Sequence, residues 1–150
     1  MLQDEIGSIM KYCHTLNPVK IYSERIPQNM AIPSMYFPVP LVSSSGDTFS
    51  SYRNSYQLFI KVFAGTSPEA HNKAHIIAEG IRKARCIIPV LSAVGPPTGM
   101  YMRLNGDIQT KELDDGVAQV ALKWDSRYPY DREVYQKMGR IFLEIVVKDW

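Results

Sequence analysis

Residues 52–85 read YRNSYQLFIKVFAGTSPEAHNKAHIIAEGIRKAR, and this stretch decides the fold. Polar and apolar side chains alternate from Tyr56 to Phe63, which predicts a strand with one wholly apolar face. That face consists of Tyr56, Leu58, Ile60 and Val62. Phe59 and Phe63 make the opposite face half apolar, so we expect a partner element or a partner chain to cover it.

A helix is expected to follow this strand, after Ala64-Gly65 ends it. Two N-terminal caps are compatible with the sequence: Ser67 with Pro68 at the first helical position, or Thr66 with Glu69 as a capping box. Apolar residues then recur at spacings of three and four and form one stripe: Ala70, Ala74, Ile77, Ala78, Ile81 and Ala84. The small side chains in this stripe predict a helix that packs closely on a sheet.

The remaining elements are expected on both sides of this unit. An amphipathic helix is predicted from about Leu2 to Thr15 and a short strand at Val19–Tyr22, whereas Ile87–Val94 is expected to be an extended crossing segment. Later strands are predicted at Met100–Asn105, Gly106–Leu113, Val117–Trp124 and Arg140–Val147, with a hairpin turn at Asp114-Asp115-Gly116. The pattern predicts one α+β domain over residues 1–150, with two main helices packed on one face of a mostly antiparallel or mixed sheet.

Residues 28–51 form a segment rich in proline and serine. Pro33, Pro38 and Pro40 argue against a helix or a central strand, yet the neighbouring side chains are too apolar for a solvated linker. One interpretation is an edge strand at Met35–Leu41 followed by a polar hairpin loop. The other is an arm that docks on another subunit and reaches full burial of its apolar half only in the oligomer. The two interpretations are compatible.

Composition limits the class of protein. The chain has 150 residues, of which 45% are hydrophobic and 21% charged, as in an ordinary globular domain. The net charge of +2 is too small to indicate nucleic acid as the main partner. Cys13 and Cys86 are expected to be buried free thiols in a reducing compartment, with a bridge between them as the alternative. The acidic N-terminus and the lack of a long apolar run predict synthesis in the cytosol and no membrane span.

The sequence shows no motif for catalysis or cofactor binding. His71, His75 and Glu79 stand at helical spacing, but they lack the His-Glu-x-x-His pattern and drift away from the apolar stripe, so we interpret them as a solvated face. No nucleophile elbow and no glycine-rich phosphate loop is present. The arginines are scattered, and no basic groove can be traced from the sequence. We therefore expect no enzymatic activity, no metal and no cofactor.

Four parts of the chain resemble small tail proteins of long-tailed phages and prophages. They are the N-terminal helix, the strand and helix of residues 56–85, and two polar-apolar segments, VPLVSSSGD at residues 39–47 and DDGVAQVALKWDSRY at residues 114–128. Together they resemble the tail terminator family, which includes the phage lambda type and is related in role to head–tail joining minor tail proteins. The likeness covers most of the chain.

The resemblance implies an α/β sandwich that works as a hexameric ring in the assembled tail, with a monomer in solution as the alternative state before assembly. Such a ring would cap the tail tube, end its growth and provide the surface that attaches the head. The implied partners are other copies of the chain, the tail tube protein and head connector proteins. DNA would pass through the ring without sequence-specific binding. The implied location is the host cytoplasm during assembly, and then the head–tail joint of the virion. The family has no catalytic residues to carry over.

Contacts with other subunits or with the tail are expected at two places. The proline- and serine-rich segment contributes Met35, Tyr36, Phe37, Val39, Leu41, Ser43, Ser44, Ser45, Gly46 and Asp47, and the late turn contributes Asp114 and Asp115.

Two other functions stay open. One is a head-completion or connector-binding adaptor at the head–tail joint. The other is a small nucleic-acid-binding protein or metal-dependent enzyme, which the charge balance and the missing motifs disfavour.

Overall fold

A computed structural model describes residues 2–23, 25–92 and 97–131. The strand predicted at Arg140–Val147 lies outside the described residues. In chain order the elements are α1 (Leu2–Leu16), β1 (Lys20–Tyr22), β2 (Ser34–Tyr36), β3 (Leu41–Gly46), β4 (Ser51–Phe63), α2 (Ser67–Lys83), β5 (Ile87–Leu91), β6 (Pro97–Arg103), β7 (Gln109–Asp114) and β8 (Val117–Pro129).

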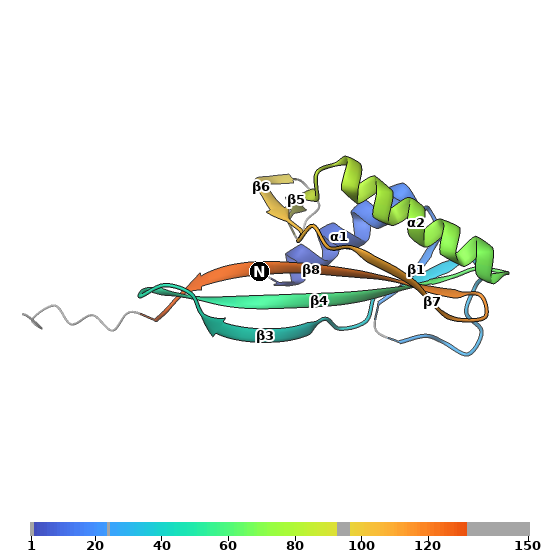
Figure 1. Cartoon of the computed structure of the whole chain (residues 1–150), viewed down its shortest axis with the longest axis horizontal. Helices are drawn as coiled ribbons and strands as arrows, with labels where there is room; N and C mark the ends of the chain where they lie inside the picture. The colour runs from blue at the N-terminus through green and yellow to red at the C-terminus, as the bar shows by residue number, and fades with distance from the viewer. Residues whose placement is uncertain (1, 24, 93–96, 132–150) are drawn as a thin grey trace, which may run out of the picture.

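The elements form a layer of helices over a sheet (Figure 1). The larger sheet has six strands in the order β1-β2-β4-β8-β7, and β3 pairs with β4 as well. Among the described strands, β1 and β2 pair in parallel and all other pairs are antiparallel. Strands β5 and β6 form a separate two-stranded sheet on the helix side. The predicted α+β class is confirmed.

The centre of the sheet is the pairing of β4 with β8, which runs without a register shift from Ser51 opposite Pro129 to Phe63 opposite Val117. Alternation along each strand places an apolar set toward the helices. On β4 the buried set is Tyr56, Leu58, Ile60 and Val62, as predicted, and on β8 it is Ala118, Val120, Leu122 and Trp124. Burial of each larger side chain is worth about 1.5–3 kcal/mol, so these two strands form the base of the core.

Helix α2 packs on β8, β7 and β4 through its predicted stripe. Ala70, Ala74, Ile77 and Ile81 are buried. Thr66 is the N-cap, because its Oγ1 accepts a hydrogen bond from the Glu69 backbone N–H at 3.4 Å. Of the two predicted caps, the structure therefore has the one at Thr66. The helix begins at the turn after β4, and its apolar stripe lies mainly over β8 and β7.

The segment from Ser34 to Gly46 differs from the prediction. It forms two strands, β2 and β3, in place of one strand at Met35–Leu41, and β2 lies inside the sheet between β1 and β4. Pro33 and Pro38 do not prevent this arrangement, because β2 has only three residues and fits between them. Proline excludes ladder pairing only at its own position and restricts the residue before it.

The predicted polar hairpin loop at Ser43–Asp47 was also wrong for most of its length. Ser43, Ser44, Ser45 and Gly46 belong to β3 and pair with Ser55, Asn54, Arg53 and Tyr52 of β4. The sequence signal for β4 begins at Tyr56, whereas the strand begins at Ser51 and provides the partner for the serines. A strand partner thus overrides the low β propensity of a serine run.

The crossing segment predicted at Ile87–Val94 contains a strand, β5, which pairs with β6 at a register shift near Pro89. Pro89 is accommodated because β5 has only one strand partner among the described residues, so the position without an N–H can face away from the ladder. The packing of α1 against this strand closes the core at that end of the helix layer.

Candidate functional site

The strongest candidate site is a projection of the sheet, which we call the arm: residues 39–57, which include β3, the β3–β4 turn and the first half of β4, and residues 123–129 of β8. Figure 1 shows these strands extending past the helices, with neither α1 nor α2 above their far end. The reason is length. Strands β4 and β8 have 13 residues each and span about 43 Å, whereas the 17 residues of α2 span about 26 Å.

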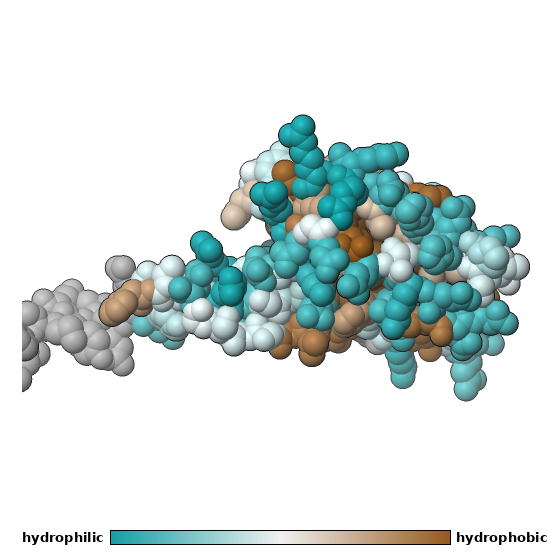
Figure 2. Space-filling view, in the orientation of Figure 1, coloured by the Kyte–Doolittle hydropathy of each residue, from teal (hydrophilic) through white to brown (hydrophobic). Residues whose placement is uncertain are grey.

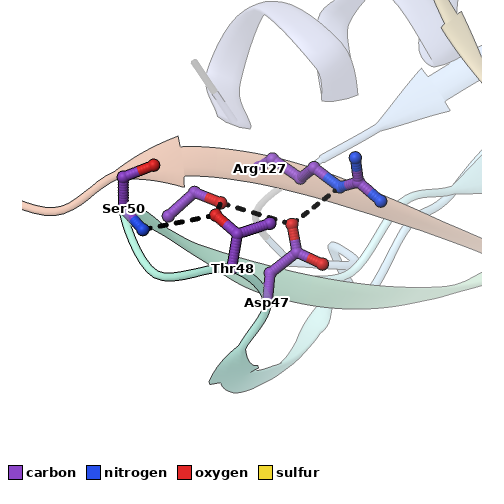
Figure 3. A network of polar contacts seen from close by, with 5 residues as sticks. Asp47, Thr48, Ser50 and Arg127 are labelled. Carbon is purple, nitrogen blue, oxygen red and sulfur yellow. Dashed lines mark hydrogen bonds and ion pairs between the residues drawn. The ribbon is translucent and has the colours of Figure 1, made fainter.

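A polar network fixes the turn at the end of the arm (Figure 3). The Asp47 carboxylate lies 2.9 Å from Nε of Arg127 on β8 and accepts a hydrogen bond from the Ser51 hydroxyl at 3.3 Å. The hydroxyls of Thr48 and Ser51 lie 2.5 Å apart, and the Ser50 backbone N–H donates to Thr48 at 3.3 Å. These contacts join the β3–β4 turn to β8, so the three strands end as one unit.

Tyrosine rings pack on the helix side of the arm. Tyr52 contacts Tyr128 and Tyr130, with ring centroids 5.7 and 5.5 Å apart. The hydroxyls of Tyr56 and Tyr128 lie 3.3 Å apart. Desolvation and then the hydrogen bond with Tyr56 raise the pKa of Tyr128 above its ordinary value. The rings give the arm a packed surface of its own where the helices no longer cover the sheet.

The base of the arm is attached to α1 through Glu5. One oxygen of this carboxylate accepts a hydrogen bond from Nε1 of Trp124 at 2.9 Å, and the other accepts one from the Ser126 hydroxyl at 2.7 Å. Trp124 is fully buried and packs on Tyr56 with ring centroids 5.4 Å apart. The first turn of α1 therefore sets where the arm leaves the core.

Large apolar side chains are exposed along this arm and at its end. Phe49, in the turn between β3 and β4, is fully exposed, and Val39, just before β3, is 87% exposed. Leu41 and Val42 at the start of β3 are exposed by 59% and 49%. In Figure 2 the projecting part is mainly hydrophilic or neutral, and apolar surface gathers below its junction with the body. Val39, Leu41 and Val42 lie together at the base of the arm, whereas Phe49 lies alone at its tip. Exposed apolar residues grouped as at the base are typical of a contact surface.

Sequence analysis missed Phe49. In the sequence, Phe49 is the single aromatic residue inside the polar run from Ser43 to Ser51. The structure places it in the turn, where its side chain is exposed to water. A fully exposed phenylalanine at the end of a projecting hairpin has the form of an anchor that inserts into a partner.

The structure separates the predicted contact residues into two groups. Met35 and Phe37 are fully buried in the core of the single chain, so their burial requires no partner, and the expectation that they would be buried only in an oligomer was wrong for these two. Tyr36 is half-buried, with its ring 6.0 Å from Nζ of Lys61. Val39, Leu41 and the serines of β3 remain on the surface.

Asp114 and Asp115 lie far from the arm, at the β7–β8 turn at the opposite end of the sheet (Figure 1). Ser67 at the start of α2 donates to the Asp115 carboxylate at 3.0 Å and accepts from the Gly116 backbone N–H at 3.0 Å. These contacts join the turn to the helix, which gives the two aspartates a structural role and does not bring them together with the other predicted contact residues.

The part of the chain that the structure describes contains no cluster of side chains suited to a metal ion. No group of three His, Cys, Asp or Glu side chains there is placed to hold a metal ion. His75 and Glu79 form an exposed pair at 3.6 Å, as expected of a solvated helix face. Cys13 and Cys86 are free and buried, and burial raises the pKa of the Cys13 thiol to about 12. A thiol with such a pKa is a poor nucleophile at neutral pH.

Comparison with known proteins identifies relatives over most of the chain. The chain is 42% identical over 132 residues to the uncharacterized protein YqbJ of Bacillus subtilis (strain 168), covering 88% of this chain and 90% of the relative. It is 37% identical over 131 residues to the phage-like element PBSX protein XkdJ of the same organism, covering 87% and 89%. The chain belongs to the XkdJ family.

Membership of the XkdJ family rests on these relatives, because no family model matches the sequence. A chain in a solved structure described as the virion of a native gene transfer agent particle is 12% identical, covers 83% of this chain and 94% of that chain, and has a TM-score of 0.47. Among the described residues, every helix is too short or too polar to cross a membrane.

Proposed function

We propose that this member of the XkdJ family is a structural component of a phage or prophage particle, and that it forms a ring at the end of the tail tube. In this role it ends tail growth and provides the surface that attaches the head. Its partners are other copies of the chain, the tail tube protein and the head connector, and its location is the head–tail joint. The proposal includes no enzymatic activity and no cofactor.

The observation that carries the proposal is the projecting arm, which occurs in a chain that is related to a phage-element protein. Phe49 and Val39 expose apolar surface on a projection that is braced by the Asp47–Arg127 pair and attached to the core through Glu5. Exposed apolar side chains on a braced element lose little conformational freedom when a partner covers them, so they favour assembly. A component that joins several other proteins in a particle requires surfaces of this kind.

The alternative function is a head-completion or connector-binding adaptor. Both functions use the same arm, and they differ in what fails when the protein is missing. Electron micrographs of particles from a lysogen lacking this gene decide between them. Tails of uncontrolled length are expected for a terminator. Tails of normal length without heads would contradict the terminator function and favour the adaptor. Complementation with the intact gene controls for effects on neighbouring genes.

A further inference from the structure

The sheet face that α1 and α2 do not cover is open at the base of the arm. Paired residues of neighbouring strands share one face of a sheet, and so do alternate residues along a strand. Leu41 of β3 lies opposite Gln57 of β4, which lies opposite Lys123 of β8. Phe63, farther along β4 on the same face, is buried, so the open part ends before it. We call the open part, together with the exposed residue just before β3, the base patch: Val39, Leu41, Gln57, Phe59, Lys61 and Lys123.

The base patch combines apolar surface with positive charge. Leu41 is 59% exposed and Phe59 is half-buried. Lys61 and Lys123 are half-buried, and neither forms an ion pair within the described residues. Asp125 lies on the same face two residues beyond Lys123, toward the end of the arm, and it forms no ion pair there either. The patch is therefore suited to a partner surface that is both apolar and acidic.

A surface of that character occurs in the same chain, at the β7–β8 turn. Glu112, Asp114 and Asp115 are exposed, and none of them forms an ion pair within the described residues. Leu113 lies among them and is 40% exposed. Lys111 precedes them, so one lysine and three carboxylates leave this segment with a net charge of −2. We call the surface the acidic turn: Glu112, Leu113, Asp114 and Asp115.

The acidic turn is held against the start of α2. The Ser67 hydroxyl donates to the Asp115 carboxylate and accepts from the Gly116 backbone N–H, both at 3.0 Å. The Ala64 backbone N–H donates to the Gly116 carbonyl oxygen at 2.9 Å. A turn fixed in this way loses little conformational freedom when a partner covers it. It also cannot fold onto the base patch of its own chain, which lies on the opposite face of the sheet.

We propose that the acidic turn of one copy docks on the base patch of the next copy. Leu113 then lies against Leu41 and Phe59 of the neighbour. The carboxylates of the turn lie beside Lys61 and Lys123, and this charge complementarity sets the orientation of the two copies. The inference rests on the ring in the proposed function and adds which two surfaces join its members. Because the two surfaces differ, each copy uses both of them, and the contact repeats head to tail until the ring closes.

Charge reversal of each surface tests the contact. Lys61→Glu/Lys123→Glu reverses the base patch, and Glu112→Lys/Asp114→Lys reverses the acidic turn. Either variant alone brings like charges together, so its self-association at low salt should weaken by about tenfold or more, as measured by analytical ultracentrifugation. An equal mixture of the two variants should associate again. The reversed patch of one variant then meets the reversed turn of the other, and their unchanged surfaces match as well.

Controls separate the contact from general effects of charge. Lys11→Glu/Lys83→Glu makes the same change of charge at exposed positions on α1 and α2, and Asp107→Lys does so before β7. Both should associate within about twofold of the unchanged chain, because exposed charges far from a contact are screened. Glu112→Lys alone keeps the hydrogen bond from the Asp115 backbone N–H to Asp114, and it should show the same loss to a smaller extent. Circular dichroism melts check that every variant folds.

Three results would overturn the inference. The first is an unchanged chain that does not self-associate at low salt, either in solution or on purified tails. The second is association of both reversed variants at the strength of the unchanged chain. The third is loss of association in each reversed variant without recovery in the mixture, which would point to a different acidic protein as the occupant of the base patch.

The inference and the proposed function can fail separately. Recovery of association in the mixture, together with tails of normal length in the lysogen that lacks the gene, would support the contact between copies and contradict the terminator function. Tails of uncontrolled length in that lysogen, together with normal association of both reversed variants, would support the proposed function and overturn the contact.

Discussion

At the scale of single residues, burial decides which positions of α2 matter for stability. Ile77 is fully buried between the helix and β8, whereas His75, two residues earlier, lies on the exposed side beside Glu79. The two side chains are similar in size and lie in the same helix. A comparison between them therefore shows how the buried and the exposed side of the helix differ in their contribution to stability. The helix phase predicted from the alanine and isoleucine spacing is the one that the structure shows.

We expect Ile77→Ala to lower the free energy of unfolding by about 2–5 kcal/mol, because it removes buried methyl groups and leaves a cavity between α2 and the sheet. His75→Ala is the matched control and should change it by less than about 0.5 kcal/mol, as at other surface positions. Urea unfolding followed by circular dichroism measures both values. The opposite ranking would show that the helix phase is wrong.

At the scale of secondary-structure elements, the arm depends on contacts between segments far apart in the sequence. Glu5 of α1 accepts hydrogen bonds from Trp124 and Ser126 of β8. Arg127 of β8 forms an ion pair with Asp47 of the β3–β4 turn. Each of these pairs joins the arm to another part of the chain. The arm is therefore held in a fixed orientation relative to the helices, although neither α1 nor α2 covers its end.

We expect Glu5→Ala to destabilise the chain by about 1–3 kcal/mol, because the buried Trp124 N–H loses its acceptor. Glu5→Gln keeps one acceptor oxygen and should lose less. Asp4→Ala, one residue earlier in the same helix turn, serves as a control for the loss of negative charge near the helix N-terminus. Thermal unfolding ranks the three variants, and equal losses for Glu5→Ala and Asp4→Ala would contradict the role given to the Glu5 contacts.

At the scale of the whole molecule, the two ends of the sheet have different character. The β7–β8 turn is joined to α2 through Ser67, whereas the arm extends past the helices and exposes Phe49 and Val39. A projection that exposes apolar side chains is suited to contact a different surface of the next copy, and such head-to-tail contacts close into rings when the rotation between copies allows it. Phe37 is unsuitable for testing this contact, because it is buried in the core and its loss would unfold the chain.

We expect Val39→Ser/Phe49→Ser to leave the unfolding midpoint within about 2 °C, because both side chains are exposed, and to weaken assembly of the chain with itself or with tails. Ile76→Ser/Met100→Ser removes comparable exposed apolar surface elsewhere and is the control. Sedimentation velocity with and without purified tails measures the assembled fraction. Normal assembly by the arm variant would show that the arm is not the contact surface.

The sequence by itself determined the elements whose signal is local. Residues 56–63 alternate and α2 repeats its apolar side chains every three or four positions, so each face of these elements is fixed by spacing. The hairpin at Asp114-Asp115-Gly116 follows from turn residues, and Gly116 has a φ of +73°, where other residues are strained. The likeness to phage tail proteins was also read from the sequence, and the XkdJ relationship agrees with a phage-element origin.

Only the tertiary structure decided the features that depend on pairing between distant segments. The serines of β3 gain their strand from β4, and Met35 and Phe37 gain their burial from the core, so local composition could not place them. The lysines of β4, β7 and β8 show the same limit. Lys61, Lys111 and Lys123 are far apart in the sequence, and a net charge of +2 gives no indication that they share a face. The strand register brings them to one face, because it fixes which side of each strand faces the helices and which faces solvent.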